Sequence, residues 1–242
     1  MSIPRLRMLA GPNGSGKSTL FEDLRKLLPI GHWLNPDKVE RELARDGGVD
    51  FSKWGVVVEE ADLHNFFRGH GLCGKLPASQ QITLPPVIAN RLVLPLPFER
   101  TYLSSILCDY LRTRWLTARV SFTFETVMSH PGKFDFFSKA RTAGYRTYLY
   151  FICTDSPLIN QDRVTNRAAS GGHDVAADKI VERYQRSLAL MPIVVRTAWR
   201  AYLFDNSSSD GHRLVAEFHE GRLIFLSAEP PPVWAVQSSV LA

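Results

Sequence analysis

Short apolar runs alternate with segments of helical periodicity along most of the chain. Runs rich in β-branched, aromatic and leucine residues predict strands at 5–10, 119–126, 145–153 and 200–205, with a shorter one at 32–37. Apolar residues three and four positions apart predict helices at 19–28, 38–44, 54–70, 99–117, 131–143, 155–169 and 174–191. This alternation predicts an α/β fold, a mostly parallel sheet with helices on both faces.

Three stretches of the chain depart from this alternation of strands and helices. Residues 71–98 carry five scattered prolines, and we expect a proline-rich insertion near the substrate side. Residues 212–218 and 223–226 predict a C-terminal hairpin that turns at Glu220-Gly221. The tail 228–242 contains three consecutive prolines and suggests no chemistry. Without repeats or a clear linker, the sequence predicts a single domain over 1–242.

A glycine-rich segment directly follows the first predicted strand. It matches the phosphate-binding pattern G-x-x-x-x-G-K-[ST] at every fixed position. Glycines let backbone N–H groups turn inward around phosphate oxygens, because no Cβ blocks the approach. Lys17 can reach the β- and γ-phosphates, and Ser18 offers a hydroxyl to Mg²⁺. The predicted cofactors are ATP and Mg²⁺, and the nucleotide-binding residues are Gly11, Pro12, Asn13, Gly14, Ser15, Gly16, Lys17, Ser18 and Thr19.

The same segment has a simpler interpretation, a glycine-rich turn between a strand and a helix. The flanking sequence favours the phosphate loop, because residues 19–28 have helical spacing and stop at Pro29. A helix that starts near Lys17 would also direct its positive N-terminal end at the phosphates. We therefore expect nucleotide binding.

Two carboxylates are predicted at strand ends, the edge where open α/β sheets bind ligands. Pro36 forces Asn35 into an extended conformation, so Asp37 is presented just past the second strand. Asp37 can equally be the N-cap of the next helix, and the two roles can coexist. Glu125, followed by Thr126, closes the strand 119–126; it could hold Mg²⁺ or a substrate group, or be a surface residue.

Arginines flank a glycine pair late in the chain. Arg163 and Arg167 are four apart, hence on one face of the predicted helix 155–169, which ends at Ser170-Gly171-Gly172-His173. Asp174 is the expected N-cap of the next helix, whose residues Lys179, Arg183 and Arg186 share a side. These basic residues have two possible interpretations. They form a solvated basic surface, or residues 155–191 form a helical lid that neutralises phosphate charge.

Composition narrows the functional class only a little. The 242 residues are 45% hydrophobic and 22% charged, with no apolar run long enough to span a bilayer and no secretory signal, so we expect a cytoplasmic protein. Three scattered cysteines without a C-x-x-C pair argue against a disulfide framework or zinc site. The formal charge of +5 suits a nucleotide. The chain has no dense basic run and no interleaved basic and aromatic segment, which argues against nucleic acid as a partner.

These motifs together resemble the zeta-toxin family of P-loop kinases. The resemblance rests on Gly11–Thr19, Asn35-Pro36-Asp37, residues 121–126 and the Arg163/Arg167–Gly-Gly-His block, in that order, and covers about residues 5–190. It implies a nucleoside-kinase-like α/β fold, phosphorylation of a hydroxyl of a small molecule such as UDP-N-acetylglucosamine with ATP, and an antitoxin protein as a partner.

The resemblance also implies roles for individual residues. Lys17 and Ser18 would hold ATP and Mg²⁺, and Asp37 would accept the proton of the attacking hydroxyl. Glu125 would lie on the metal or substrate side, with Asn35 and Thr126 near the substrate, and Arg167 with Arg163 would clamp the phosphates. The stretch 54–98 is longer and richer in proline than the family pattern, so the acceptor stays open. The alternatives are a polynucleotide 5′-hydroxyl kinase and a regulatory ATP-binding switch.

Overall fold

The chain forms two compact units. A computed structural model describes residues 2–95, 97–169 and 175–241. The first unit combines Met1–Gly31 with Ser121–Ala242, and the second is His32–Val120. The expected hinge at 170–173 and the expected cap at Asp174 lie outside the described residues.

The first unit is built on a mixed sheet whose central strands are parallel. Its strands run in the order β10-β9-β8-β7-β1-β6. β6, β1, β7 and β8 pair in parallel, whereas β9 pairs with β8 and β10 in antiparallel fashion. The predicted mostly parallel sheet and the C-terminal hairpin are thus confirmed. The strands are β1 (Arg5–Ala10), β6 (Phe122–Thr126), β7 (Arg146–Cys153), β8 (Arg200–Asp205), β9 (Arg213–His219) and β10 (Arg222–Leu226).

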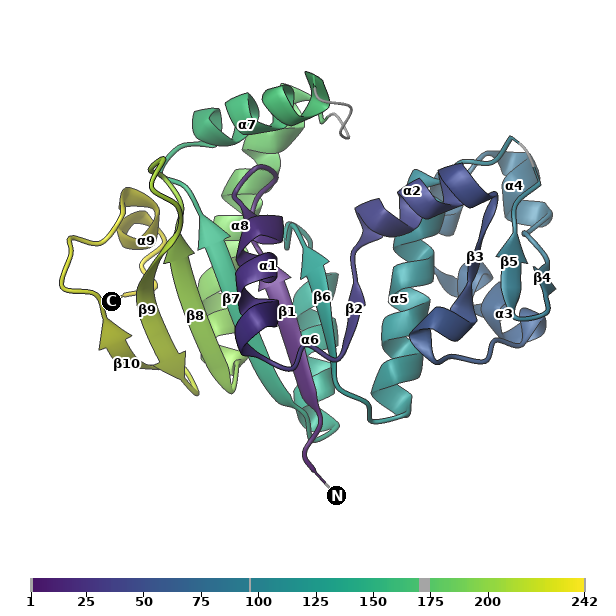
Figure 1. Ribbon diagram of the computed structural model, residues 1–242, viewed down its shortest axis with the longest axis horizontal. Coiled ribbons are helices and arrows are strands. Elements are labelled where there is room, and N and C mark those ends of the chain that lie inside the picture. The colour runs from purple at the N-terminus through teal and green to yellow at the C-terminus, as the bar shows by residue number, and fades with distance from the viewer. Residues whose placement is uncertain (1, 96, 170–174, 242) are drawn as a thin grey trace. The chain divides into compact units, whose positions relative to one another are not determined.

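Helices cover both faces of this sheet (Figure 1). α1 (Lys17–Leu27) lies on one face, and α6 (Gly132–Thr142) and α8 (Ala177–Thr197) lie on the other. α7 (Pro157–Ala169) packs beside α8 at the end where the parallel strands finish. α8 continues past Pro192, where the sequence predicts an end, because the turns beyond it bury Val194 and Val195 and so offset the lost backbone hydrogen bond.

The tail also folds onto the first unit. Residues 233–237 form α9 (Val233–Gln237), which carries the fully buried indole of Trp234. The indole packs against Phe151 of β7, with ring centroids 5.9 Å apart, and its Nε1 donates to Asp205 Oδ1 at 3.0 Å. The tail is therefore part of the core, which its proline-rich composition does not suggest.

The second unit combines helices with a small antiparallel sheet in the order β3-β5-β4. The helix predicted from residue 54 begins instead at Glu60, after a 3-10 turn at Phe51–Trp54. Most of the stretch 71–98 contributes short elements to this unit. The elements are β2 (His32–Leu34), α2 (Pro36–Asp46), β3 (Gly48–Asp50), α3 (Glu60–Gly69), α4 (Ala78–Ile82), β4 (Val87–Ile88), β5 (Arg91–Val93) and α5 (Thr101–Thr117).

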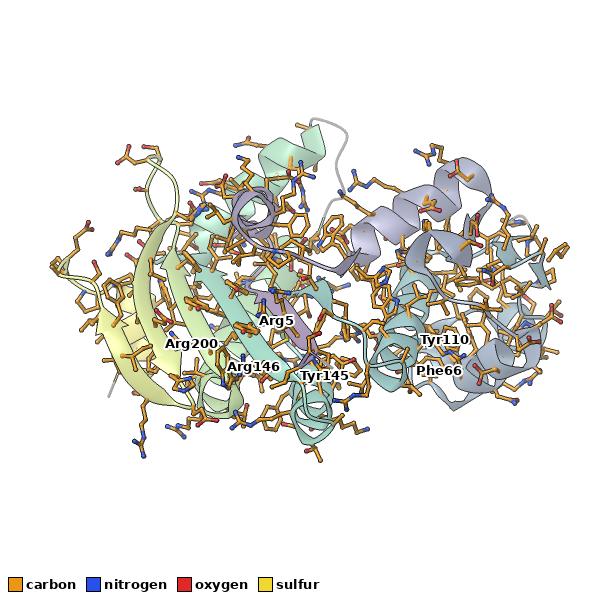
Figure 2. The ribbon with its side chains drawn as sticks, turned by 60° about the horizontal axis from the view of Figure 1, so that its bottom comes forward. Arg5, Phe66, Tyr110, Tyr145, Arg146 and Arg200 are labelled. Atoms are coloured by element: carbon orange, nitrogen blue, oxygen red, sulfur yellow. The ribbon has the colours of Figure 1, made fainter. Side chains whose placement is uncertain are left out.

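The helix α5 is the centre of the second unit. It packs against α2 and α3, and its Trp115 is buried, with Nε1 donating to the carbonyl of Trp54 at 3.0 Å. Tyr110 contacts Phe66 of α3 edge to face, at 5.3 Å between ring centroids (Figure 2). None of the helices described in either unit is long and apolar enough to cross a membrane.

Candidate functional site

The glycine-rich segment forms a tight loop between β1 and α1. β1 lies between β6 and β7, so the loop opens at the carboxyl edge of the parallel strands, beside the point where the chain reverses direction across the sheet. Gly11 has φ +148°, and a Cβ there would lie 2.1 Å from the carbonyl oxygen of Ile152. Only glycine lets the loop approach β7 this closely.

Lys17 and Ser18 begin the helix that follows the loop. Gly16 is the N-cap of α1, with a left-handed backbone, and Lys17 is the first helical residue. The Lys17 ammonium group donates to the carbonyls of Gly11 and Pro12, at 2.9 and 2.8 Å, so its positive charge lies within the loop. The predicted arrangement of loop, lysine and helix N-terminus is present.

Glu125 lies beside Ser18 at the end of β6. Its register partner on β1 is Leu9, and its side chain is buried with 8% exposure. The Ser18 hydroxyl donates to Glu125 Oε1 at 3.4 Å. The hydroxyl of the neighbouring Thr126 accepts from the backbone N–H of Met128 at 3.1 Å, so it helps to turn the chain after β6. Sequence reasoning correctly placed Glu125 at this edge.

Two asparagines that the sequence analysis missed each donate a hydrogen bond to the loop. Asn160 of α7 is fully buried, and its Nδ2 donates to the carbonyl of Asn13. Asn206, directly after β8, donates to the carbonyl of Ser15 at 2.9 Å. Arg163 in turn donates to the carbonyl of Asn206 at 2.9 Å. This arginine therefore helps to position Asn206, which contacts the loop. A polar residue just past a strand end was the only sequence signal for Asn206.

A further arginine reaches the loop from α8. Arg183 Nη1 lies 3.5 Å from the side-chain oxygen of Asn13, which places a guanidinium group beside the phosphate-binding backbone. The sequence placed Arg183 on a basic helix side without assigning it to the site. Arg167, the predicted phosphate clamp, is exposed near the end of α7. Helix α8 therefore brings Arg183 to the loop, whereas the lid and the clamp role of Arg167 stay predictions.

Asn35 and Asp37 belong to the second unit, at the start of α2. The structure decides which of them caps the helix: the Asn35 side chain accepts from the backbone N–H groups of Asp37 and Lys38. The expectation that Asp37 is the cap is thus corrected, because the extended residue before Pro36 has the N-cap conformation. The Asp37 carboxylate is not needed for capping.

The buried asparagine of α7 provides a test of how the loop is supported. Asn160→Ala removes the donor to the Asn13 carbonyl and the acceptor of the Thr154 hydroxyl. Leaving buried polar groups unpaired should lower the free energy of unfolding by about 1–3 kcal/mol. We also expect weaker ATP binding by isothermal titration calorimetry. Thr165→Ala, exposed on the same helix, is the control, and equal effects of the two variants would contradict this role for Asn160.

The cysteines play no part in this site. All three are free and buried, and burial raises the pKa of the Cys153 thiol to about 12. Cys153 is therefore a protonated core residue at physiological pH. In the described parts of the chain, no three His, Cys, Asp or Glu side chains cluster as a complete metal site.

The sheet order, the phosphate loop at its edge and the flanking helices form the α/β fold with a phosphate loop that the motifs predict. No family model and no curated protein matches the chain.

Solved structures share the fold, among them the following three. The complex of AvrRxo1-ORF1 with AvrRxo1-ORF2, crystallised with sulphate ions, has a chain with a TM-score of 0.57 and 15% identity over 93% of this chain. The same complex with ATP gives a TM-score of 0.56 and 16% identity over 92% of this chain. The chain spans about three fifths of these neighbours, 62% and 60% of their lengths. A chain of the PezAT toxin–antitoxin system of Streptococcus pneumoniae gives a TM-score of 0.50 and 13% identity, over 90% of this chain and 72% of that one.

Proposed function

We propose that the protein is an ATP-dependent kinase that phosphorylates a hydroxyl group of a small molecule, with a nucleotide sugar as the first candidate. The observation that carries this proposal is the meeting of Lys17, Ser18, Glu125 and Arg183 around one glycine-rich loop. Phosphoryl transfer leaves a protein little covalent work, so positioning, charge neutralisation and one carboxylate base suffice.

Each residue has a role that follows from its chemistry. The loop N–H groups and the N-terminus of α1 bind the phosphates, and Lys17 offsets their negative charge. Arg183, with Arg167 and Arg163 on α7, neutralises charge on the transferred group from the helical lid. Asp37 accepts the proton of the acceptor hydroxyl, a role for which its freedom from capping leaves it available. Asn35 and Thr126 border the acceptor.

The residues beside the loop fit Mg²⁺. This ion takes oxygen ligands, and in kinases one or two protein groups suffice because phosphates and water fill the other positions. Ser18 and the buried Glu125 supply such a pair, with their oxygens 3.4 Å apart. When bound there, the ion would offset charge on the phosphate oxygens.

Two structural neighbours support two further parts of the proposal. The AvrRxo1-ORF1:-ORF2 complex has been crystallised with ATP, and PezAT is a toxin–antitoxin system. We infer that ATP is the donor, and that an antitoxin protein is a partner of this chain. Co-expression with the protein encoded by the neighbouring gene, followed by size-exclusion chromatography, tests the second point, and separate elution would contradict it.

Label transfer tests the reaction. Purified protein is given γ-labelled ATP and Mg²⁺ with UDP-N-acetylglucosamine, a panel of polyols and nucleosides, and a 5′-hydroxyl oligonucleotide. Label in a small molecule, lost with Lys17→Ala, is the expected result. Label in the oligonucleotide would indicate the polynucleotide kinase instead. Release of inorganic phosphate with no labelled acceptor would indicate the regulatory ATP-binding switch.

Glu125 should set the magnesium requirement of the reaction. Glu125→Gln removes a charge beside Ser18 while keeping the size of the side chain. We expect the Mg²⁺ concentration for half-maximal label transfer to rise about 10- to 100-fold. Glu22→Gln is the control, because Glu22 is an exposed carboxylate paired with Arg25 on α1. An unchanged Mg²⁺ requirement in Glu125→Gln would remove this residue from the metal site.

A further inference from the structure

Arginines gather on one face of the sheet, at the end away from the phosphate loop. Residues paired across neighbouring strands point to the same side of a sheet. Arg5 pairs with Arg146, and a second row crosses five strands through Arg7, Tyr148, Arg200, His219 and Arg222. Figure 2 shows Arg5, Arg146 and Arg200 close together on this side of the sheet. We call the surface formed by Arg5, Arg146, Arg200 and Arg222 the arginine face.

The arginine face carries an excess of positive charge. The next row in the same register adds one carboxylate, Glu217, which forms an ion pair with Arg200. Arg7 lies beneath the face with 3% exposure, 5.5 Å from the ring centroid of Tyr148. Within the described residues, its Nε and Nη1 have no hydrogen-bond partner. Four arginines on the face, with Arg7 buried beneath them, thus outnumber one glutamate, and such a surface attracts a polyanion.

Aromatic rings hold these arginines in place. The guanidinium carbon of Arg146 lies 4.8 Å from the ring centroid of Trp199, and that of Arg200 lies 5.5 Å from it. Tyr148 packs edge-on against the same indole at 5.1 Å. Guanidinium groups stacked on rings keep their hydrogen-bond donors available while losing conformational freedom, which favours binding of phosphate groups.

The same face also offers aromatic surface to a ligand. Phe225 of β10 is 43% exposed and pairs with Glu217, beside the partly exposed Tyr202. Leu223, the exposed aliphatic residue in register with Phe218, points to the opposite side. Rings and arginines on an open sheet suit stacked bases and a phosphate backbone. An acidic protein segment would match the charge of this face, but it brings no row of flat rings to stack on Phe225 and Tyr202.

We propose that the arginine face binds single-stranded nucleic acid. This site is separate from the phosphate loop, because Arg5 begins β1 whereas the loop follows Ala10, about 17 Å further along the strand at 3.3 Å per residue. The proposal does not depend on the kinase reaction. The isolated sequence argued against nucleic acid because the arginines of the face come from four strands that are separated along the chain.

Fluorescence anisotropy with a labelled dT12 oligonucleotide tests the proposal on the whole chain without ATP. The triple variant R5Q/R146Q/R222Q removes three charges from the face and leaves the Arg200–Glu217 pair intact. We expect at least tenfold weaker binding. The slope of log K against log salt should fall by about 2, because each lost phosphate contact on a single strand contributes about 0.7.

A charge-matched variant and a ring variant complete the design. R45Q/R68Q/R114Q removes three exposed arginines of the second unit and should bind dT12 with the salt slope of the wild type. Phe225→Ala, which truncates an exposed ring, should weaken binding about tenfold through lost stacking. Equal salt slopes for the two triple variants would overturn the proposal. So would tighter binding of a polyglutamate peptide of the same charge, which would assign the face to an acidic protein.

Discussion

Asp37→Asn is expected to lower the kcat of phosphoryl transfer by about 10²- to 10⁴-fold, the usual contribution of a general base. The amide cannot accept the proton of the acceptor hydroxyl, but it has nearly the same size as the carboxylate. Helix α2 should stay intact, since Asn35 rather than Asp37 caps it. The measurement is transfer of label from γ-labelled ATP, together with the affinity for ATP, which should not change.

Asp46→Asn is the matched control for this experiment. Asp46 ends the same helix and pairs with the exposed Arg45, so the loss of its charge should leave kcat unchanged. Lys17→Ala gives the reference for a disabled donor site. If Asp37→Asn keeps most of the activity while Lys17→Ala loses it, Asp37 is not the base.

Trp234→Ala should destabilise the first unit by about 3–5 kcal/mol, the range for truncating a large buried aromatic side chain. The indole is fully buried, so its removal leaves a cavity beside Phe151. The buried carboxylate of Asp205 also loses the Nε1–H donor at 3.0 Å. Urea denaturation followed by circular dichroism measures the loss. Asn206, which holds the phosphate loop, directly follows Asp205, so ATP binding should weaken as well.

Val236→Ala is the control for the tail. It lies on the same short helix and is 59% exposed, so its truncation should change the free energy of unfolding by less than about 0.5 kcal/mol. A Trp234→Ala variant no less stable than Val236→Ala would show that the tail does not belong to the core.

The parts of the fold that sequence predicted well are those set by local pattern. Strand β8 has the predicted bounds, and α5 and β7 differ from the prediction by one or two residues at their starts. Their apolar residues repeat at the spacing of a strand or a helix, so neighbouring positions alone specify the element. The phosphate loop could be predicted equally well, because all its fixed positions lie within eight consecutive residues.

Contacts between residues far apart in the sequence could not be predicted from local pattern. Asn160 reaches a loop residue 147 positions away, and Asn206 reaches one 191 positions away. Neither asparagine belongs to a local motif, so only the packing of α7 and the end of β8 against the loop reveals their role. The same holds for Arg183, which the sequence placed in the expected lid but could not place beside Asn13.

The sequence by itself determined the class of fold, the phosphate loop and the carboxylate that ends β6, because each depends on short-range periodicity or spacing. The tertiary structure decided that Asn35 caps α2, that Trp234 belongs to the core and that four strands assemble an arginine face. These features depend on which elements pack together and in what register, and a one-residue shift in register would turn every side chain of a strand to the other side. Register is a property of the folded sheet, and no single stretch of the chain encodes it.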